Sequence, residues 1–181
     1  MKAHLMQSLW ILGTVFLWSQ LSVGSERKIP LLFVLYDAGE TLALFPVMNE
    51  LGKAGGGYKA LVMGTARDVM KAHTDTLDIS KDCGTTAVID QQTWSREREL
   101  SDNDLKKVDE CFDARIIFTG MVSKVQHQIV SMQQKSMRKV FAFYDGLTSL
   151  KKESISYSFL SIAHKTLVPS RKIARQIKKI M

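Results

Sequence analysis

The chain has 181 residues and a formal charge of +7, with 25 lysines and arginines against 18 aspartates and glutamates. This length suits one domain of ordinary size that buries a real core. The two cysteines form no CxxC pair and no histidine–cysteine cluster has zinc spacing, which argues against a structural metal. We expect no other cofactor either.

The first 25 residues have the layout of a secretory signal peptide. Lys2 and His4 give a weakly positive start, an apolar stretch runs from Leu9 to Leu21, and Val23-Gly24-Ser25 supplies small residues for cleavage. The apolar stretch is shorter than the roughly 20 residues that span a membrane comfortably. We therefore expect an exported protein, either periplasmic or secreted.

Removal of residues 1–25 would leave one domain over residues 26–181, whereas an uncleaved leader would anchor the chain in a membrane through residues 5–23.

Export would also affect the state of the two cysteines, Cys83 and Cys111. In an oxidising compartment they can pair and close a loop of about 28 residues, a link worth roughly 3 kcal/mol. In a reducing compartment they would remain ordinary buried thiols.

The first half of the domain alternates apolar runs with helical patterns. A continuous apolar run at residues 29–36 is typical of a strand buried on both faces. A helix is predicted over residues 41–54, with Pro46 near its first turn, where a missing N–H does least harm. A second strand at 58–63 and a short helix at 65–72 follow.

The second half continues this alternation. The run Thr85–Ile89 predicts the third strand, and Ser101 is expected to cap the helix that follows, at residues 101–112. Between them, the charged run Arg96–Glu99 is interpreted as a solvated, self-neutralising surface segment. The remaining predicted elements are strands at 115–118, 139–144 and 166–168 and helices at 122–135, 149–158 and 169–181.

Short apolar strands that alternate with helices predict a parallel sheet covered on both faces by right-handed crossovers. We therefore predict an α/β fold: a single Rossmann-like, doubly wound parallel sheet of about six strands, preceded by the signal peptide. No long linker, low-complexity tract or repeat of fixed period divides the chain.

Ligands of open α/β sheets sit beyond the carboxyl ends of the strands. The loops that this rule selects are 37–40, 64–67, 119–123 and 145–147. The first loop has Gly39 but lacks the G-x-G-x-x-G pattern of a dinucleotide site, and Asp37 and Glu40 would repel a pyrophosphate. We therefore expect a neutral hydroxylated ligand here, such as a glycan or another small molecule.

Asp37 has two interpretations. It is the candidate general base of the rim, a role that requires a suitable position and a shifted pKa. Alternatively, its side chain caps the following helix. The residues expected to contact a ligand are Gly39, Glu40, Thr119, Gly120, Asp145 and Gly146.

Positive charge is concentrated at the end of the chain. The basic residues that face no carboxylate after Glu153 are Arg171, Lys172, Arg175, Lys178 and Lys179. Such a tail suggests contact with an anionic surface such as lipid headgroups. Alternatively, the isoleucines of the terminal helix pack against the sheet and leave the cations in water, as in most surface helices. We expect no nucleic acid, because no aromatic platform accompanies this charge.

The rim loops lie within stretches that resemble a known family. The stretch DAGETLALFPVMNELGKAGGGYKALVMGTARD resembles the opening of GT-B glycosyltransferases and of the related sugar-nucleotide epimerases and lipid-disaccharide synthases. In these proteins the first strand ends in a small polar loop and leads into a helix with an early proline. The later stretches ARIIFTGMVSK, KVFAFYDG and TLVPSRKIARQI are similar to further units of the same domain, so the resemblance covers residues 29–181.

The resemblance implies the N-terminal, acceptor-side domain of such an enzyme. The histidine that is frequent in the first loop of the family is absent here. In GT-B enzymes a second Rossmann-like domain holds most of the sugar nucleotide, so glycosyl transfer would require a second lobe or a partner chain. The residues that would border the acceptor are Asp37, Gly39, Glu40, Thr119, Gly120, Asp145 and Gly146.

The sequence leaves three hypotheses open. The first is a glycosyltransferase-like half domain that binds a glycan or another hydroxylated ligand and catalyses transfer only with a second domain. The second is an exported α/β protein that binds a small molecule. The third is a membrane-apposed interaction protein that acts through its basic terminal helix.

Overall fold

The computed structural model describes residues 31–73, 76–86, 96–112, 114–134, 138–146, 150–151 and 153–180. The predicted signal peptide at 1–25 and the alternative anchor at 5–23 lie outside these residues. Within the described ranges, none of the helices has the length and apolar character that a membrane span requires.

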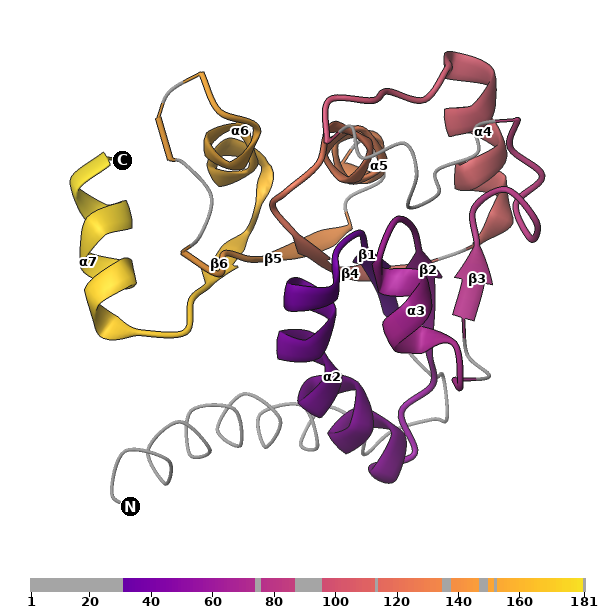
Figure 1. Ribbon diagram of the computed structural model, residues 1–181, viewed down its shortest axis with the longest axis horizontal. Coiled ribbons are helices and arrows are strands. Elements are labelled where there is room, and N and C mark those ends of the chain that lie inside the picture. The colour runs from indigo at the N-terminus through magenta and orange to yellow at the C-terminus, as the bar shows by residue number, and fades with distance from the viewer. Residues whose placement is uncertain are drawn as a thin grey trace.

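Six strands form one sheet in which every pair of neighbours is parallel (Figure 1). The strand order is β3-β2-β1-β4-β5-β6, the order of a doubly wound Rossmann-like sheet. The predicted fold class, an α/β domain built on one parallel sheet, is therefore confirmed. The strands are β1 (Leu31–Leu35), β2 (Tyr58–Val62), β3 (Thr76–Asp78), β4 (Ile116–Gly120), β5 (Lys139–Phe143) and β6 (Lys165–Leu167).

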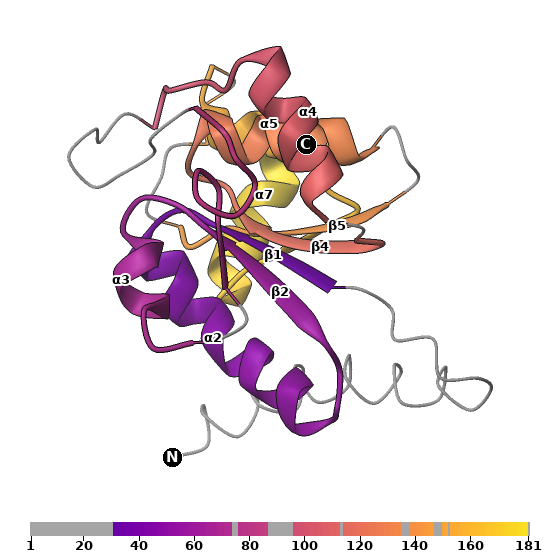
Figure 2. The same cartoon turned by 90° about the vertical axis from the view of Figure 1, so that its right-hand side faces the viewer.

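Helices cover both faces of the sheet. Figure 1 shows α2 and α3 on one side and α4, α5 and α6 on the other, and Figure 2 shows the same division for α2 and α3 against α4 and α5. This division follows from right-handed crossovers, because the chain moves outward from β1 in one direction and outward from β4 in the other. The helices are α2 (Ala38–Lys53), α3 (Ala66–Met70), α4 (Asp102–Cys111), α5 (Lys124–Gln134), α6 (Ile155–Ile162) and α7 (Arg171–Ile180).

The centre of the sheet has a core on each face. All five residues of β1 are buried, which explains why this strand is an uninterrupted apolar run. Because side chains alternate along a strand, Leu32 and Val34 join the core beneath α5 and α6, whereas Phe33 and Leu35 join the core beneath α2 and α3. This double burial holds β1 in the middle of the fold.

The third strand is not where the sequence predicted it. The structure places β3 at Thr76–Asp78, whereas Thr85 and Thr86 lie outside any strand and the rest of the predicted run 85–89 falls outside the described residues. The observed strand pairs only with β2, and its three residues are half-buried. A short edge strand of this kind has no apolar run to reveal it.

Two helices also differ from their predicted bounds. α2 begins at Ala38, so Pro46 lies inside the helix and not in its first turn. Since proline donates no backbone hydrogen bond, the carbonyl of Leu42 loses its partner one turn earlier. α6 begins later than predicted, at Ile155, because the Ser154 hydroxyl accepts a hydrogen bond from the Tyr157 N–H at 3.2 Å and so caps the helix there.

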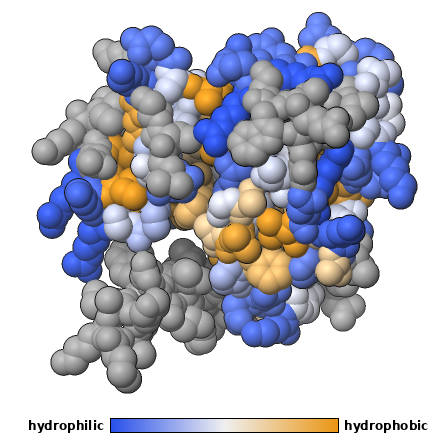
Figure 3. Space-filling model, viewed as in Figure 1, coloured by the Kyte–Doolittle hydropathy of each residue, from blue (hydrophilic) through white to orange (hydrophobic). Residues whose placement is uncertain are grey.

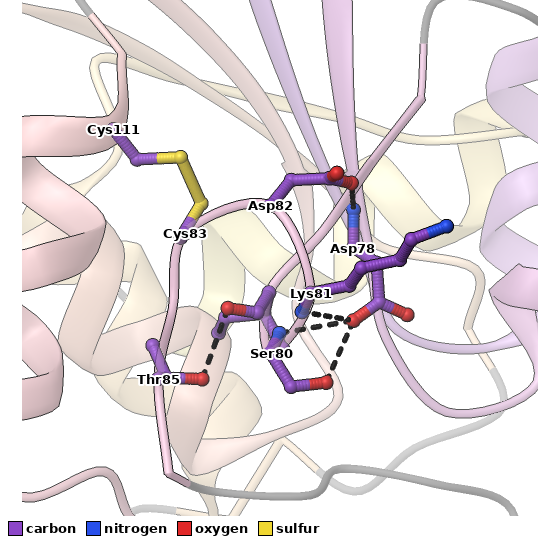
Figure 4. Close-up of a disulfide and its surroundings, with 8 residues drawn as sticks. Asp78, Ser80, Lys81, Asp82, Cys83, Thr85 and Cys111 are labelled. Atoms are coloured by element: carbon purple, nitrogen blue, oxygen red, sulfur yellow. Dashed lines mark hydrogen bonds between the residues drawn. A yellow bond between two sulfur atoms is a disulfide. The ribbon is translucent and has the colours of Figure 1, made fainter.

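Cys83 and Cys111 are joined in a disulfide that ties the loop after β3 to the end of α4 (Figure 4). Hydrogen bonds within the loop support the link. The Asp78 carboxylate accepts from the Ser80 N–H at 2.9 Å and from the Ser80 hydroxyl at 2.7 Å, and Thr85 donates its hydroxyl to the Ile79 carbonyl at 3.0 Å. The disulfide thereby fixes the β3 edge of the sheet to α4, which lies on the face away from α2 and α3.

Breaking the disulfide should destabilise the domain. The two cysteines are 28 positions apart, and a loop of this size predicts a loss of about 3 kcal/mol in the free energy of unfolding. We expect urea unfolding of the Cys83→Ser/Cys111→Ser variant, followed by circular dichroism, to show this loss. The reduced wild type should match the variant, and a reductant should leave the variant unchanged. An oxidised wild type that unfolds at the same urea concentration as the variant would contradict the assignment.

Candidate functional site

The strand order changes direction between β1 and β4, and this is the point at which open parallel sheets form their ligand crevice. β1 and β4 are hydrogen-bonded neighbours, in register from Leu31 opposite Ile116 to Val34 opposite Thr119. The segment after β1 enters α2 on one face, and the segment after β4 enters α5 on the other. Two of the predicted rim loops, 37–40 and 119–123, therefore meet at this switch point.

The N-terminus of α2 is closed by its own carboxyl groups. Asp37 is the N-cap, and its Oδ1 accepts a hydrogen bond from the Glu40 N–H at 2.9 Å. Glu40 folds back in a capping box, and its Oε1 accepts from the N–H groups of Tyr36 at 2.5 Å and Asp37 at 3.3 Å. A further N–H, that of Ala38, donates to the hydroxyl of Thr65 at 2.9 Å. Four N–H groups around this helix start are thus already bonded and not free for a phosphate.

Glu40 also links α2 to α5. Its side chain is almost fully buried, and Gln126 donates its amide Nε2 to the Glu40 Oε1 at 2.6 Å and to the Val34 carbonyl at 3.1 Å. The other end of the Gln126 amide accepts from the Ser123 hydroxyl at 3.1 Å, and Ser123 in turn accepts from the Gln126 N–H at 3.3 Å. This buried network connects β1, α2 and α5. Sequence analysis identified Glu40 as a rim residue but missed Gln126, which carries no motif.

The second oxygen of Glu40 lies against the backbone of β4. A Cβ atom added to Gly120 would overlap the Glu40 carboxyl group, and Oε2 is the atom nearest to it. Oε2 is buried and has no hydrogen-bond partner among the described residues. Gly120 is therefore the residue that leaves room for Glu40, a role in packing that differs from the ligand contact expected from the sequence.

Burial raises the pKa of Glu40 from its ordinary value of 4.5 to about 8, and the nearby Asp37 charge acts in the same direction. The hydrogen bonds from Tyr36, Asp37 and Gln126 oppose the increase but do not outweigh it. At neutral pH the group is accordingly a carboxylic acid.

The charged segment 96–99 contacts the starts of both α2 and α5. Arg96 places its Nη2 3.6 Å from Oδ2 of Asp37, and its carbonyl accepts from the Lys124 N–H at the start of α5 at 2.8 Å. The Lys124 ammonium pairs with Glu97 at 3.3 Å and Glu99 at 3.1 Å. The run 96–99 thus pairs with the two helix starts, whereas the sequence suggested that its charges neutralise one another. These pairs are solvent-exposed, so each contributes little to stability.

The other predicted rim residues are placed differently. Gly39 is exposed, whereas Thr119 is fully buried and donates its hydroxyl to the Gly120 carbonyl at 3.0 Å. Asp145 and Gly146 follow β5, two strand spacings or about 10 Å from β1. Gly146 has a positive φ of 86° and lies beneath Ile173 of α7. All lie at the carboxyl edge of the sheet. The switch point brings together Asp37, Gly39, Glu40, Thr119 and Gly120, whereas Asp145 and Gly146 lie farther along the sheet.

Among the described residues, no group of three or more histidine, cysteine, aspartate or glutamate side chains could hold a metal ion. No protein-family model, curated protein or solved structure matches this chain. The fold and the switch-point geometry therefore define the class: a Rossmann-like α/β domain whose candidate site carries carboxyl groups where nucleotide sites carry open N–H groups.

The raised pKa of Glu40 should make stability depend on pH. The folded protein holds this proton more tightly than the unfolded chain, so stability should fall as the pH rises from the unfolded pKa of 4.5 to about 8. In Glu40→Gln, which keeps the shape and an acceptor oxygen, this part of the slope should disappear. We expect the two free energies of unfolding to diverge by on the order of 3 kcal/mol between about pH 5 and about pH 9, measured by urea titration.

Glu50→Gln is the matched control for this experiment, because Glu50 lies on the same helix but its side chain is 48% exposed. This control should retain the slope of the wild type. A Glu40→Gln protein with the same pH profile as the wild type would show that Glu40 is ionised in the folded state.

The contact between Glu40 and Gly120 can be tested with a double-mutant cycle. Gly120→Ala should destabilise the protein by roughly 2–4 kcal/mol because the new methyl group displaces the Glu40 carboxyl. In the Glu40→Ala background the same change should have a much smaller effect. Gly52→Ala is the control. Gly52 lies within α2, and a Cβ atom added there has no neighbour within 4 Å, so this change should be neutral or stabilising. Equal losses for Gly120→Ala in both backgrounds would refute the contact.

Proposed function

We propose that this chain is a binding domain similar to the acceptor-side half of GT-B glycosyltransferases and that it takes up a glycan or another hydroxylated ligand at the switch point. The observation that carries the proposal is the capping of α2 by Asp37 and Glu40. Nucleotide sites in this position use open N–H groups to hold phosphate. Here the N–H groups of Asp37, Ala38 and Glu40 are bonded within the chain, and the second carboxyl oxygen of Asp37, Oδ2, favours a hydroxyl donor over an anion.

The contacts available to such a ligand are few and specific. Gly39 is exposed on the outer side of the loop, and among the described residues the contact of Oδ2 of Asp37 is the 3.6 Å ion pair with Arg96. A hydroxyl group could donate to Oδ2 of Asp37 in place of that ion pair and accept from the released guanidinium. One sugar ring offers both kinds of hydroxyl interaction within this short distance.

This geometry favours a role for Asp37 in ligand binding over a role as a catalytic base. One of its oxygens accepts the helix-cap hydrogen bond from the Glu40 N–H, and the other lies 3.6 Å from the Arg96 guanidinium, so both already have partners that a general base would have to give up. We infer that glycosyl transfer, if this protein takes part in it, uses a donor site on a second domain or partner chain. The domain itself would then position the acceptor.

We also propose that the protein is exported. The layout of residues 1–25 and the disulfide both support this, because structural disulfides persist mainly in oxidising compartments. In such a compartment nucleotide sugars are scarce and glycans are abundant, which agrees with a glycan-binding role.

Calorimetric titration of the purified protein with a panel of neutral oligosaccharides and a panel of nucleotide sugars tests the proposal. We expect saturable binding to a member of the first panel only. Asp37→Asn should keep the cap, because asparagine caps helices as well as aspartate does, but should weaken binding by about tenfold. Lys53→Gln, at the far end of α2, serves as the control.

Two results would defeat the proposal. One is that no member of either panel binds. The other is binding of nucleotide sugars that Asp37→Asn leaves unchanged. Saturable binding of a small molecule that is not a glycan, again sensitive to Asp37→Asn, would instead favour an exported small-molecule-binding protein that uses the same site.

A further inference from the structure

The terminal helix α7 presents its apolar side to the rest of the protein. Ile177 is only 7% exposed and belongs to the core that α5 and α6 cover, and Ile173 packs against that core. Ile173 also lies directly over Gly146, where an added Cβ would come within 2.5 Å of its side chain. The Ser170 hydroxyl accepts from the Ile173 N–H at 3.3 Å and fixes the start of the helix. The orientation of α7 is therefore set by the fold.

This orientation leaves the basic side chains of α7 facing outward. Arg171, Lys172, Arg175 and Lys178 are all exposed, and none forms an ion pair with another residue that the structure describes. At about 100° per residue they fall within an arc of about 120° on the helix, opposite the isoleucines. Figure 1 shows α7 at the outer end of the molecule beyond β6, and Figure 3 shows hydrophilic side chains along its outer side. We call these four residues the α7 basic face.

The α7 basic face differs from an ordinary solvated helix surface because it has no acids. The sequence contains no aspartate or glutamate after Glu153, so the helix itself carries no acid to balance the four cations. Lys124, by contrast, pairs with two acids, Glu97 and Glu99. Four cations without an interleaved acid thus lie on one helix at one edge of the fold, an arrangement suited to a flat anionic partner.

The disulfide narrows the choice of partner. It indicates an oxidising compartment, where membranes are present but intracellular nucleic acid is not. α7 also contains no aromatic residue on which bases could stack. Since Ile177 is buried in the protein, the helix has little apolar surface to insert into lipid. The expected mode is peripheral and electrostatic.

We propose that the α7 basic face binds an anionic lipid surface and holds the β6 edge of the domain against a membrane. This contact is separate from ligand binding at the switch point and does not depend on it. Each basic residue close to such a surface strengthens binding by about fivefold, and the effect is screened by salt.

Sedimentation with lipid vesicles tests the proposal on the full chain. We expect binding to phosphatidylcholine vesicles that contain about 30% phosphatidylserine or phosphatidylglycerol, and at least tenfold weaker binding to pure phosphatidylcholine. Raising the salt from about 50 mM to about 500 mM should abolish the difference. An uncleaved apolar leader would instead bind both kinds of vesicle regardless of salt, so equal binding to the two compositions overturns the proposal.

A charge-matched pair of variants locates the effect. Glutamine at all four positions of the α7 basic face (R171Q, K172Q, R175Q, K178Q) should reduce binding to anionic vesicles by at least tenfold. The control variant K71Q/K81Q/K106Q/R115Q removes the same charge from exposed residues outside α7 and should bind within about threefold of the wild type. Equal losses in the two variants would mean that only net charge matters and would overturn the proposal.

Folding and partner class are checked in the same experiment. Circular dichroism should show that both variants keep the wild-type spectrum; if the α7 variant unfolds, the salt and lipid dependence of the wild type decides alone. Single-stranded DNA of matched charge is the competing ligand. If it removes the protein from anionic vesicles at a lower charge concentration than soluble anionic lipid headgroups do, the surface is a polyanion site and not a lipid site.

Discussion

The buried carboxyl group of Glu40 is the constraint on which the switch point depends. One oxygen accepts hydrogen bonds from Tyr36 and Asp37 at the end of β1 and from Gln126 on α5, and the other lies against Gly120 at the end of β4. A single side chain thus holds together the two halves of the sheet where their helices diverge. Burying a carboxylate in an apolar interior is very costly. The raised pKa relieves this cost, because the group remains neutral at pH 7.

The same contacts support the kind of ligand that we propose for the switch point. Helix starts at the switch points of parallel sheets bind anions when their N–H groups remain open. In this protein Asp37 and Glu40 occupy the start of α2, and the Ser123 hydroxyl accepts from the Gln126 N–H in the first turn of α5. Several of the N–H groups that could bind an anion are therefore bonded within the chain. The ligand that we propose donates a hydroxyl hydrogen to the second carboxyl oxygen of Asp37.

Charge is arranged so that the two proposed surfaces do not interfere. At the switch point, Arg96 faces Asp37, and Lys124 faces Glu97 and Glu99, so positive and negative groups are interleaved. The unbalanced positive charge lies on α7, at the other side of β4 and β5 from the start of α2. The surface proposed to contact lipid is therefore separate from the proposed ligand site. The disulfide fixes the opposite edge, at β3.

Much of the fold could be predicted because its central strands carry a strong signal. A parallel strand covered on both faces must be apolar throughout, and β1 is. Local caps were equally visible: Ser101 was expected to start a helix, and its hydroxyl accepts from the Asp104 N–H at 3.2 Å. β3 was missed because a three-residue, half-buried edge strand has no such pattern. Pro46 was misplaced because the capping box extends α2 toward its N-terminus.

The sequence by itself therefore determined the class of fold, the edge of the sheet that carries the loops, and the segregation of basic residues at the end of the chain, since each follows from local pattern. Only the tertiary structure decided what the loop residues do. Glu40 and Gln126 are 86 positions apart and meet only because β1 and β4 are neighbours in the sheet. Whether Asp37 caps a helix, Gly120 makes room for a carboxyl or Arg96 pairs with Asp37 depends on burial and distance in space, and neither quantity is set by residues adjacent in the chain.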